Sequence, residues 1–383
     1  MTRSIHRLWV LLLALPLLLA ACGQSPSGSQ GAAPTAVQNT GPTADTAAAP
    51  TADTAGASTA APATGEPVTL RLAYFPNLTH AVGVIGVGRG TFKDTLGSNV
   101  TLDVKTFNAG PALIEALFAG EVDLGYIGPN PAINGYVRSR GEALRIIAGA
   151  SSGGASFIVR PEANIKSAKD LEGKKIASPQ KGGTQDVALR HYIAENGLKT
   201  SEEGGTVQVL PTENPNILTL FQQGQLDGAW VPEPWATRLI LEGKGEVFVD
   251  ERTIWPEGKF VTTNVIVSKK FLDEHPDVVA KFLEAHVDTV EWINANKTEA
   301  KTIINQEIER ITTKGLPAEV LDKAFETTDI TYDPLPATLF KSAEDAFNLG
   351  FLGDTKPDLA GLYDLKPLND VLTAKSLPLV QAP

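Results

Sequence analysis

The sequence predicts an α/β protein with two lobes, each built on a largely parallel sheet. Short β-type runs alternate with helical patterns, and this order requires right-handed crossovers between parallel neighbours. The part of the chain with this pattern, residues 66–383, is long enough for two lobes with separate cores. The alternation breaks near residues 156–160, and a β-branched run at 260–268 follows the second group of elements. We therefore expect two chain passages between the lobes, which implies a hinge.

The first lobe begins with two runs whose apolar and polar residues alternate, as in half-buried strands. Between the second and third strands, Leu113, Ala116 and Leu117 form a helical stripe that ends at Gly120. The expected elements are strands at 68–75, 101–107, 122–126 and 144–148, a helix following Gly110, a helix at about 132–139, and a strand-like segment at 156–160. Because no helix separates the last two strands, the first passage is expected just after Arg160.

The second lobe repeats the same rhythm. Its expected elements are a turn at 165–171, strands at 175–178, 207–210 and 228–231, and helices at about 184–196 and 217–223. The run at 260–268 returns the chain to the first lobe, and a single long amphipathic helix at 270–294 follows. Residues 300–347 are expected to be helical, and residues 350–383 show no pattern that assigns them.

The N-terminal segment has the pattern of a secretory signal peptide, residues 1–21. Arg3 and Arg7 precede an apolar run at 8–19 that is too short to span a bilayer, and small residues lead to Cys22. Residues 19–22 resemble the bacterial lipobox, which leaves a lipid-modified cysteine at the new N-terminus, and two acyl chains on its sulfur would give stable anchoring. The alternative is ordinary signal cleavage beside an incidental cysteine.

Residues 22–65 are expected to form a disordered tether, because they are rich in Ala, Thr and Pro and contain no aromatic residue. Cys22 is the one cysteine in the chain, so no intramolecular disulfide can form. The formal net charge of −11 argues against a nucleic-acid partner. The five histidines show no zinc-ligand spacing, and neither a metal nor a cofactor is expected. We expect a monomer.

Six β-type runs end in short patches of small or polar residues that open a helical pattern. These patches lie at 77–79, 108–111, 128–131, 180–185, 214–216 and 232–235. Helix N-termini present unpaired N–H groups and the positive end of the helix dipole, so several that meet in one crevice make an anion site. In open α/β sheets this crevice lies at the carboxyl ends of the strands. The pattern favours a binding protein over an enzyme.

Candidate ligand-binding residues come from these patches and from the end of the strand before the first passage. They are Asn77, Thr79, His80, Gly110, Gly128, Asn130, Ser151, Ser152, Gly182, Gly183, Thr184, Gln185, Glu233 and Trp235. The turn at 182–185 is the preferred anion contact, because two glycines allow close backbone approach. Ser151 and Ser152 fit either a ligand contact or a hinge. Trp235 could line one side of an organic ligand. Glu233 would repel an anion, so it is expected to be structural or to pair with a cationic substituent.

A hydrolase is the main enzymatic alternative, since residues 149–153 fit the G-x-S-x-G pattern. That motif requires a helix directly after the serine, but residues 155–160 have a strand pattern. His191, His275 and His286 fall in predicted helices and are expected on the surface, not in a triad. A sensory or adhesive surface domain would share the anchor and the tether, so this class stays open.

Several of these stretches resemble the bacterial periplasmic substrate-binding proteins of aliphatic sulfonate, taurine and nitrate ABC importers. The resemblance is carried in chain order by residues 70–77, 107–128, 165–178 and 228–235, and it is strongest to the sulfonate branch. It implies a type II two-lobed fold with one antiparallel strand per lobe. It also implies a small anionic solute, with a permease and an ATPase as partners. Nitrate, bicarbonate and thiamine-pyrimidine precursors are alternative ligands on the same scaffold.

The resemblance sets the expected domain boundaries. Lobe 1 comprises residues 66–160 and 258–383, and lobe 2 comprises residues 161–257. The expected location is the outer face of the cytoplasmic membrane, held there by Cys22.

Overall fold

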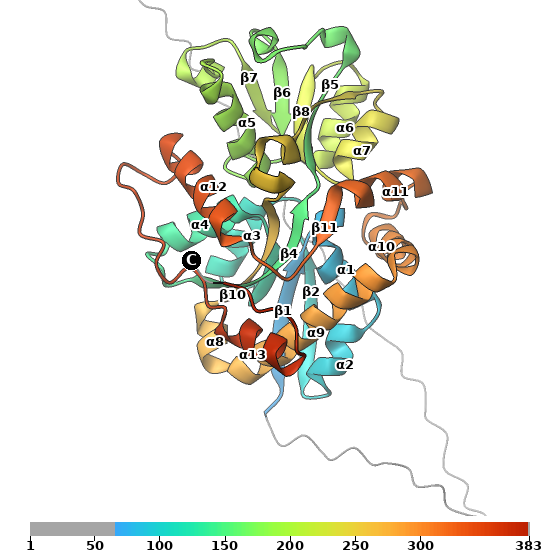
Figure 1. The fold of residues 1–383 in the computed structure, drawn as a ribbon, viewed down its shortest axis with the longest axis vertical. Helices are drawn as coiled ribbons and strands as arrows, with labels where there is room; N and C mark the ends of the chain where they lie inside the picture. The colour runs from blue at the N-terminus through green and yellow to red at the C-terminus, as the bar shows by residue number, and fades with distance from the viewer. Residues whose placement is uncertain (1–65, 382–383) are drawn as a thin grey trace, which may run out of the picture. The chain divides into compact units, whose positions relative to one another are not determined.

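The computed structural model describes residues 66–381, which belong to one compact unit. The predicted signal peptide, Cys22 and tether lie outside the described residues. The described chain forms two sheets with helices on both faces (Figure 1). We call the elements packed on the six-stranded sheet lobe 1 and those packed on the five-stranded sheet lobe 2. This is the predicted two-lobed α/β architecture.

The sheet of lobe 1 has the order β11-β4-β10-β3-β1-β2. Its strands are β1 (Val68–Tyr74), β2 (Val100–Thr106), β3 (Leu124–Ile127), β4 (Leu144–Gly153), β10 (Val261–Ser268) and β11 (Thr328–Ile330). The first three are mutually parallel, and β10 runs antiparallel between β3 and β4. The short edge strand β11 is also antiparallel. The prediction of an all-helical stretch at 300–347 missed β11, since three residues are too short to give a periodic signal.

The sheet of lobe 2 has the order β7-β6-β8-β5-β9. Its strands are β5 (Ala155–Val159), β6 (Lys175–Ser178), β7 (Gln208–Pro211), β8 (Gly228–Pro232) and β9 (Glu246–Asp250). Strands β6, β7 and β8 are parallel, and β5 is the single antiparallel strand between β8 and β9. Residues at the carboxyl ends of β1 and β3 in one sheet and of β6 and β8 in the other lie around one common pocket.

The chain passes from lobe 1 to lobe 2 at Gly153 and Gly154, between β4 and β5. This is earlier than the boundary predicted after Arg160, because β5 pairs with β8 and β9 of the second sheet. Both glycines have a positive φ, of 73° and 68°, a conformation that other residues adopt only with strain. The return passage lies between β9 and β10.

Thirteen α-helices cover the two sheets in the described part of the chain. They are α1 (Ala81–Gly88), α2 (Thr91–Leu96), α3 (Gly110–Phe118), α4 (Pro129–Arg138), α5 (Thr184–Glu195), α6 (Asn214–Gln222), α7 (Trp235–Leu241), α8 (Lys269–Glu274), α9 (Pro276–Ala295), α10 (Lys297–Thr312), α11 (Ala318–Thr327), α12 (Pro336–Asn348) and α13 (Lys366–Ala374). Short 3-10 turns are η1 (Leu78–His80), η2 (Pro161–Ala163), η3 (Ala168–Leu171), η4 (Ser201–Glu203), η5 (Glu251–Ile254) and η6 (Pro256–Gly258).

The predicted single helix at 270–294 is two helices, α8 and α9. Pro276 starts the second one, because a proline has no N–H to donate inside a helix and fits its first turn instead. Helix α13 lies in the C-terminal stretch that carried no assignable pattern. None of the helices between residues 66 and 381 is both long and apolar enough to cross a membrane.

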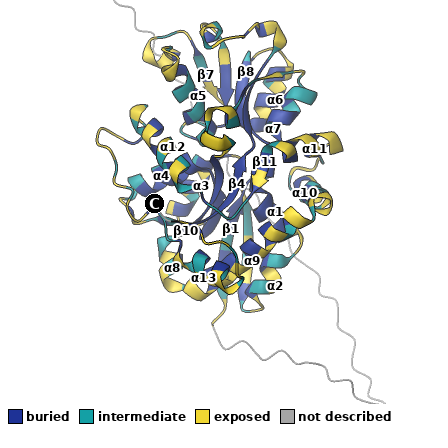
Figure 2. Ribbon diagram, viewed as in Figure 1, coloured by how far each residue is buried: buried dark blue, intermediate teal, exposed yellow. Residues whose placement is uncertain are grey.

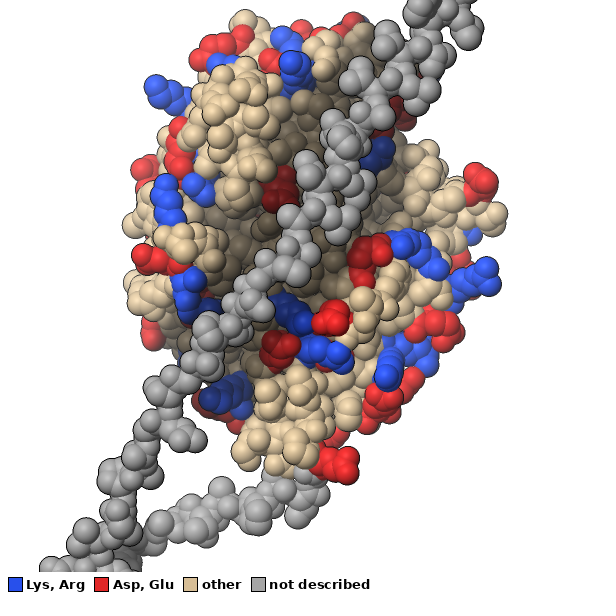
Figure 3. Space-filling view, turned by 180° about the vertical axis from the view of Figure 1, so that it is seen from behind, with Lys and Arg blue, Asp and Glu red and all other residues tan. Residues whose placement is uncertain are grey.

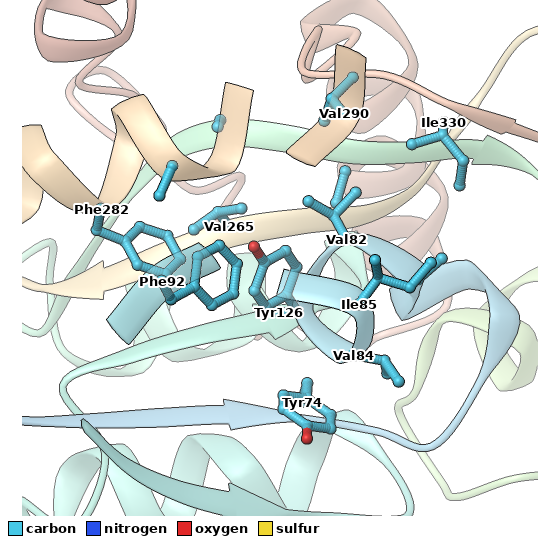
Figure 4. Close-up of a cluster of buried hydrophobic side chains, with 14 of the residues drawn as sticks. Tyr74, Val82, Val84, Ile85, Phe92, Tyr126, Val265, Phe282, Val290 and Ile330 are labelled. Carbon is cyan, nitrogen blue, oxygen red and sulfur yellow. The ribbon is translucent and has the colours of Figure 1, made fainter. Parts of the chain in front are cut away.

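The core of lobe 1 lies on both faces of its sheet, so the central strands are buried, whereas the edge strand β2 and the outer faces of the helices are largely exposed or partly exposed (Figure 2). Along β1, Leu70, Leu72 and Tyr74 face one cluster and Ala73 faces the other. The first cluster joins α1, α2 and α9 and includes the tilted rings of Phe92 and Phe282, whose centroids are 4.9 Å apart (Figure 4). This packing holds the strand ends that build the site in fixed positions.

Candidate functional site

A pocket lies where the carboxyl ends of the parallel strands of both lobes meet. All six patches singled out in the sequence contribute at least one residue to it. It is lined by Phe75, Asn77, Thr79, His80, Asn108, Ala109, Gly110, Gly128, Pro131, Pro179, Gln180, Gly183, Thr184, Gln185, Asn214, Pro232 and Thr262. Its volume is about 40 Å³. Since one water needs roughly 10–15 Å³ on this scale, the pocket has room for a group of only a few heavy atoms.

Four helices begin at the pocket, two from each lobe. Lobe 1 supplies the first residues of α3 and α4, and lobe 2 supplies those of α5 and α6. The first N–H groups of a helix have no acceptor within the helix, and the N-terminus carries a partial positive charge. Four such ends around one small pocket create a positive potential without a charged side chain.

The lobes approach closely across the pocket at Gly128 and Thr184. A Cβ atom added at Gly128 would lie 2.2 Å from Thr184 Oγ1. Gly128 has a φ of −70°, so its backbone imposes no need for glycine. The contact with the opposite lobe therefore explains the residue type at this position.

The pocket contains no Asp, Glu, Lys or Arg among its lining residues. Its one titratable side chain is His80, which is buried, and burial lowers its pKa to about 3. The Phe75 backbone N–H donates to His80 Nδ1 at 3.4 Å, so the neutral ring carries its proton on Nε2. His80 thus presents an uncharged donor, and within residues 66–381 its Nε2 makes no hydrogen bond.

Three buried side-chain atoms of the pocket have no hydrogen-bond partner in the described part of the chain. They are Gln180 Oε1, Thr184 Oγ1 and Asn214 Oδ1, all from lobe 2. A buried polar atom left unpaired costs about 1–3 kcal/mol, so native proteins pair nearly all of them. Thr184 Oγ1 can donate a hydrogen bond, whereas the two amide oxygens accept, so the pocket contains unpaired groups of both kinds.

The turn that opens α5 is braced by a buried carboxylate. Asp186 accepts from Ser178 Oγ at 2.7 Å and from the Gly182 N–H at 2.9 Å. Arg190 balances its charge through Nε at 3.0 Å. The Gly182 N–H is therefore already used, and the free donors of this turn belong to the residues that follow it.

Two residues that line the pocket also form hydrogen bonds between the lobes. Trp235 Nε1 donates to Asn77 Oδ1 at 2.9 Å, which turns the Asn77 amide nitrogen away from the tryptophan. Asn108 Nδ2 donates to Glu213 Oε2 at 3.2 Å on the exposed rim. The structure therefore shows the lobes in contact around the pocket.

The structure brings eight of the predicted ligand-binding residues together in the pocket. These are Asn77, Thr79, His80, Gly110, Gly128, Gly183, Thr184 and Gln185. Gly110 supports the backbone, since a Cβ there would lie 2.3 Å from Pro131 Cγ. The other six predicted residues do not line the pocket.

Four of these six have side chains or amides that are engaged elsewhere. Asn130 Nδ2 donates to Ser342 O at 3.2 Å, and Ser151 Oγ donates to Thr79 O at 2.8 Å. Ser152 Oγ accepts from the Phe260 N–H at 3.3 Å. Gly182 donates to Asp186, as described above. Each of these groups supports the walls of the pocket from behind.

Glu233 and Trp235 lie beside the pocket rather than in it. The Glu233 carboxylate accepts from the Thr237 N–H and from Thr237 Oγ1, both at 3.0 Å, and from Thr327 Oγ1 of lobe 1 at 3.3 Å. Burial raises the pKa of Glu233 to about 7. Its role is to join α7 to lobe 1, and Trp235 lines an adjacent pocket.

Nine further lining residues were not predicted as ligand contacts, and five of them have polar or aromatic side chains. Asn108, Gln180 and Asn214 lie inside the patches, so their position was signalled, although the direction of their side chains was not. Phe75 and Thr262 reach the pocket through tertiary packing, since Phe75 directly follows β1 and Thr262 lies within antiparallel β10. No local pattern marks either of them.

The features that suggested an enzyme have structural roles. Ser151 lies within β4, and the strand β5 follows the motif directly, so the turn of a nucleophile elbow is missing. The prediction that His286 lies on the surface is wrong, because α9 buries it completely. Phe282, His286 and Val290 share one helical face, and this spacing was the signal for burial. Residues 66–381 contain no group of three His, Cys, Asp or Glu side chains placed to hold a metal.

Comparison with known proteins identifies relatives of this architecture. The model of the family described as "NMT1-like family" matches residues 63–308. The taurine-binding periplasmic protein of Escherichia coli (strain K12) is 30% identical over 186 residues, which cover 48% of this chain and 54% of that protein. The match thus spans about half the length of that relative.

Solved structures share the fold. The alkanesulfonate-binding protein SsuA from Xanthomonas axonopodis pv. citri, bound to MOPS, has a TM-score of 0.66 at 19% identity, covering 79% of this chain and all of that one. The periplasmic nitrate-binding protein NrtA from Synechocystis PCC 6803 also has a TM-score of 0.66, at 14% identity, covering 82% of this chain and 90% of that one. At these identities the likeness establishes the two-lobed fold.

Proposed function

Because this chain belongs to the NMT1-like family, we propose that it is the solute-binding component of an ABC importer and captures a small oxyanion-bearing solute between its lobes. The observation that carries the proposal is the uncharged pocket at four helix N-termini, where the Thr184 hydroxyl is buried without a partner within residues 66–381. An anion there would accept hydrogen bonds from backbone amides, from Thr184 and from His80 Nε2. Such preformed dipoles can hold an anion without a cationic side chain.

An aliphatic sulfonate or a close relative is the solute that we favour. The pocket volume suits an oxyanion head group, and the relatives include proteins named for taurine, alkanesulfonate and nitrate. Donors come from both lobes, so the liganded form should be the closed one and the more stable one. The two proposed lobes that close on the solute are residues 66–160 with 258–383 and residues 161–257. The structure moves the first passage between them to Gly153 and Gly154.

We further infer an extracytoplasmic monomer that is anchored through lipidated Cys22 and delivers its solute to a permease driven by an ATPase. Charged side chains of both signs are interspersed on the face shown in Figure 3, which gives no support to nucleic acid as a partner. Replacing Cys22 with serine should move the protein from the membrane fraction to the soluble fraction. Retention in the membrane fraction would contradict the anchor without affecting the binding proposal.

Calorimetric titration of the purified folded part tests the proposed function. The panel comprises methanesulfonate, taurine, nitrate, sulfate, bicarbonate and an aminopyrimidine. We expect binding of at least one sulfonate, accompanied by an increase in thermal stability.

Binding of nitrate or bicarbonate alone would reassign the solute within the oxyanion class. Binding of the aminopyrimidine alone, or of no anion at any accessible concentration, would overturn the proposal. A Thr184→Val variant controls for the site, since weakened binding in this variant shows that the measured anion occupies the pocket.

A further inference from the structure

We propose that the cavity beside Trp235 is a second subsite, which receives an uncharged organic substituent of the same solute whose oxyanion lies in the pocket. This inference rests on the proposed function and extends it to the class of solute. It assigns a compound with an apolar or aromatic tail rather than a bare inorganic anion.

The two cavities adjoin, because Asn77, Asn108 and Asn214 line both of them. A solute that fills both cavities would place its linking atoms between these three amides. The second cavity has a volume of about 260 Å³, against about 40 Å³ for the first. The smaller one accommodates a head group of a few atoms, and the larger one has room for a ring or a short chain.

The wall of the second cavity is fixed before any solute arrives. The Trp235 ring is held at its edge by the hydrogen bond from Nε1 to Asn77, and the Arg238 guanidinium lies over a ring face, 4.7 Å from the centroid. Arg238 is held in turn by Glu242, with donor–acceptor distances of 2.7 Å and 3.1 Å. A rigid aromatic surface binds an apolar group with little loss of side-chain entropy.

The opposite wall comes from lobe 1. Ile308 and Thr312 of α10, together with Leu316, line the cavity along with Trp235 and Arg238 of α7. A tail in this position therefore touches both lobes and would contribute to closure. The length of the substituent should affect affinity as well as fit.

The charges around the second cavity select against a cationic tail. Arg238 is paired with Glu242, whereas Lys314 at the rim forms no ion pair within residues 66–381. No Asp or Glu is among the residues that line this cavity. A neutral substituent meets no penalty there, and an ammonium group would meet uncompensated positive charge.

The test compares dissociation constants for methanesulfonate, benzenesulfonate and an aminoalkanesulfonate by calorimetry. We expect benzenesulfonate to bind about 10- to 100-fold more tightly than methanesulfonate, the effect of burying a phenyl-sized group. In Trp235→Leu, and in Thr312→Trp, which fills the cavity from an exposed position, this ratio should approach one. Trp235→Phe should keep the preference, because it loses the bond to Asn77 but retains an aromatic wall.

The ratio separates this inference from the proposed function. If methanesulfonate binds and benzenesulfonate binds no more tightly, or if the preference persists in both Trp235→Leu and Thr312→Trp, the second subsite is refuted and the oxyanion pocket stands. Tighter binding of the aminoalkanesulfonate than of benzenesulfonate also refutes it. If no sulfonate or other anion binds, the proposed function fails and the second subsite fails with it.

Discussion

Two buried histidines of lobe 1 show how a core differs from a site. His286 in α9 uses both ring nitrogens: Nδ1 accepts from Tyr126 OH and Nε2 donates to Gly149 O, each at 2.9 Å. His80 in η1 uses one, accepting from the Phe75 N–H at 3.4 Å. Burial lowers the pKa of both, to about 4 for His286 and about 3 for His80, so both are neutral at pH 7.

The two histidines differ in whether a ring nitrogen remains without a hydrogen bond. The Tyr126 hydroxyl lies beneath α9 in the aromatic cluster of Figure 4, where His286 completes its hydrogen bonding. His80 keeps one donor for the pocket, beside the unpaired Thr184 Oγ1 and Asn214 Oδ1. Paired polar groups in the core stabilise the fold, whereas buried polar groups that stay unpaired in the pocket lower its stability.

The largest expected effect comes from breaking the paired histidine. His286→Leu should lower the free energy of unfolding by about 2–5 kcal/mol, because the Tyr126 hydroxyl and the Gly149 carbonyl both lose their partner in a buried environment. Urea unfolding measures the loss. The affinity of the folded protein for methanesulfonate should stay within about twofold, since His286 is remote from the pocket lining.

The double variant Tyr126→Phe/His286→Leu is the matched control. It removes donor and acceptor together and should recover part of the stability. A loss below about 1 kcal/mol in the single variant would show that the pairing contributes little.

Removing the unpaired Thr184 hydroxyl is expected to affect binding rather than stability. Thr184→Val should weaken methanesulfonate binding by about 10- to 100-fold, since a hydrogen bond to a charged partner contributes about 1.5–3 kcal/mol. Stability without solute should stay the same or rise slightly, because the variant replaces an unpaired buried hydroxyl with a methyl group. Thr289→Val is its control, since Thr289 Oγ1 is buried but donates to Ala285 O at 2.7 Å.

The control should lose stability and keep its affinity. If Thr184→Val and Thr289→Val change stability and methanesulfonate affinity in the same way, the distinction between pocket and core hydroxyls is wrong.

A smaller effect, on the pH dependence of stability, is expected from a buried carboxyl group in lobe 2. Glu251 accepts from Trp230 Nε1 at 2.7 Å, yet burial raises its pKa to about 7, above its ordinary value of 4.5. The folded state therefore holds a proton that the unfolded state releases, and stability falls as pH rises from about 4.5 to 7. Glu251→Gln should remove up to about 3 kcal/mol of this pH dependence.

Thermal unfolding of both proteins between pH 5 and pH 8 measures the difference. Equal slopes for the two proteins would contradict the assignment to Glu251. Methanesulfonate affinity should be unchanged at pH 5, where both side chains are uncharged.

The strand-end patches were predictable because helix starts have strong local signals, such as Pro131 and the glycines at 182 and 183. Their convergence followed from the rule that parallel strands present their carboxyl ends to one edge. Side-chain direction was not predictable at this level. Asn130 and Asn214 lie in equivalent turns, but Asn130 bonds to α12 and Asn214 faces the pocket.

Other differences between the predicted and the observed structure also arise from packing between segments that are distant in the sequence. The boundary at Gly153 and Gly154 depends on β5 pairing with strands that come much later in the chain. The helix break before Pro276 was visible locally but was outweighed by the amphipathic stripe on both sides. Glu233 was predicted to be structural or to pair with a cation, and the structure bonds it to Thr237.

The most direct test of an anion held by neutral donors is the ¹⁵N spectrum of the histidine rings at pH 6, with and without methanesulfonate. We predict that the Nε2 resonance of His80 shifts on binding and keeps the signature of a neutral ring protonated on Nε2, while both nitrogens of His286 stay unchanged. A His80 resonance that does not move, or one that becomes an imidazolium on binding, would contradict the account.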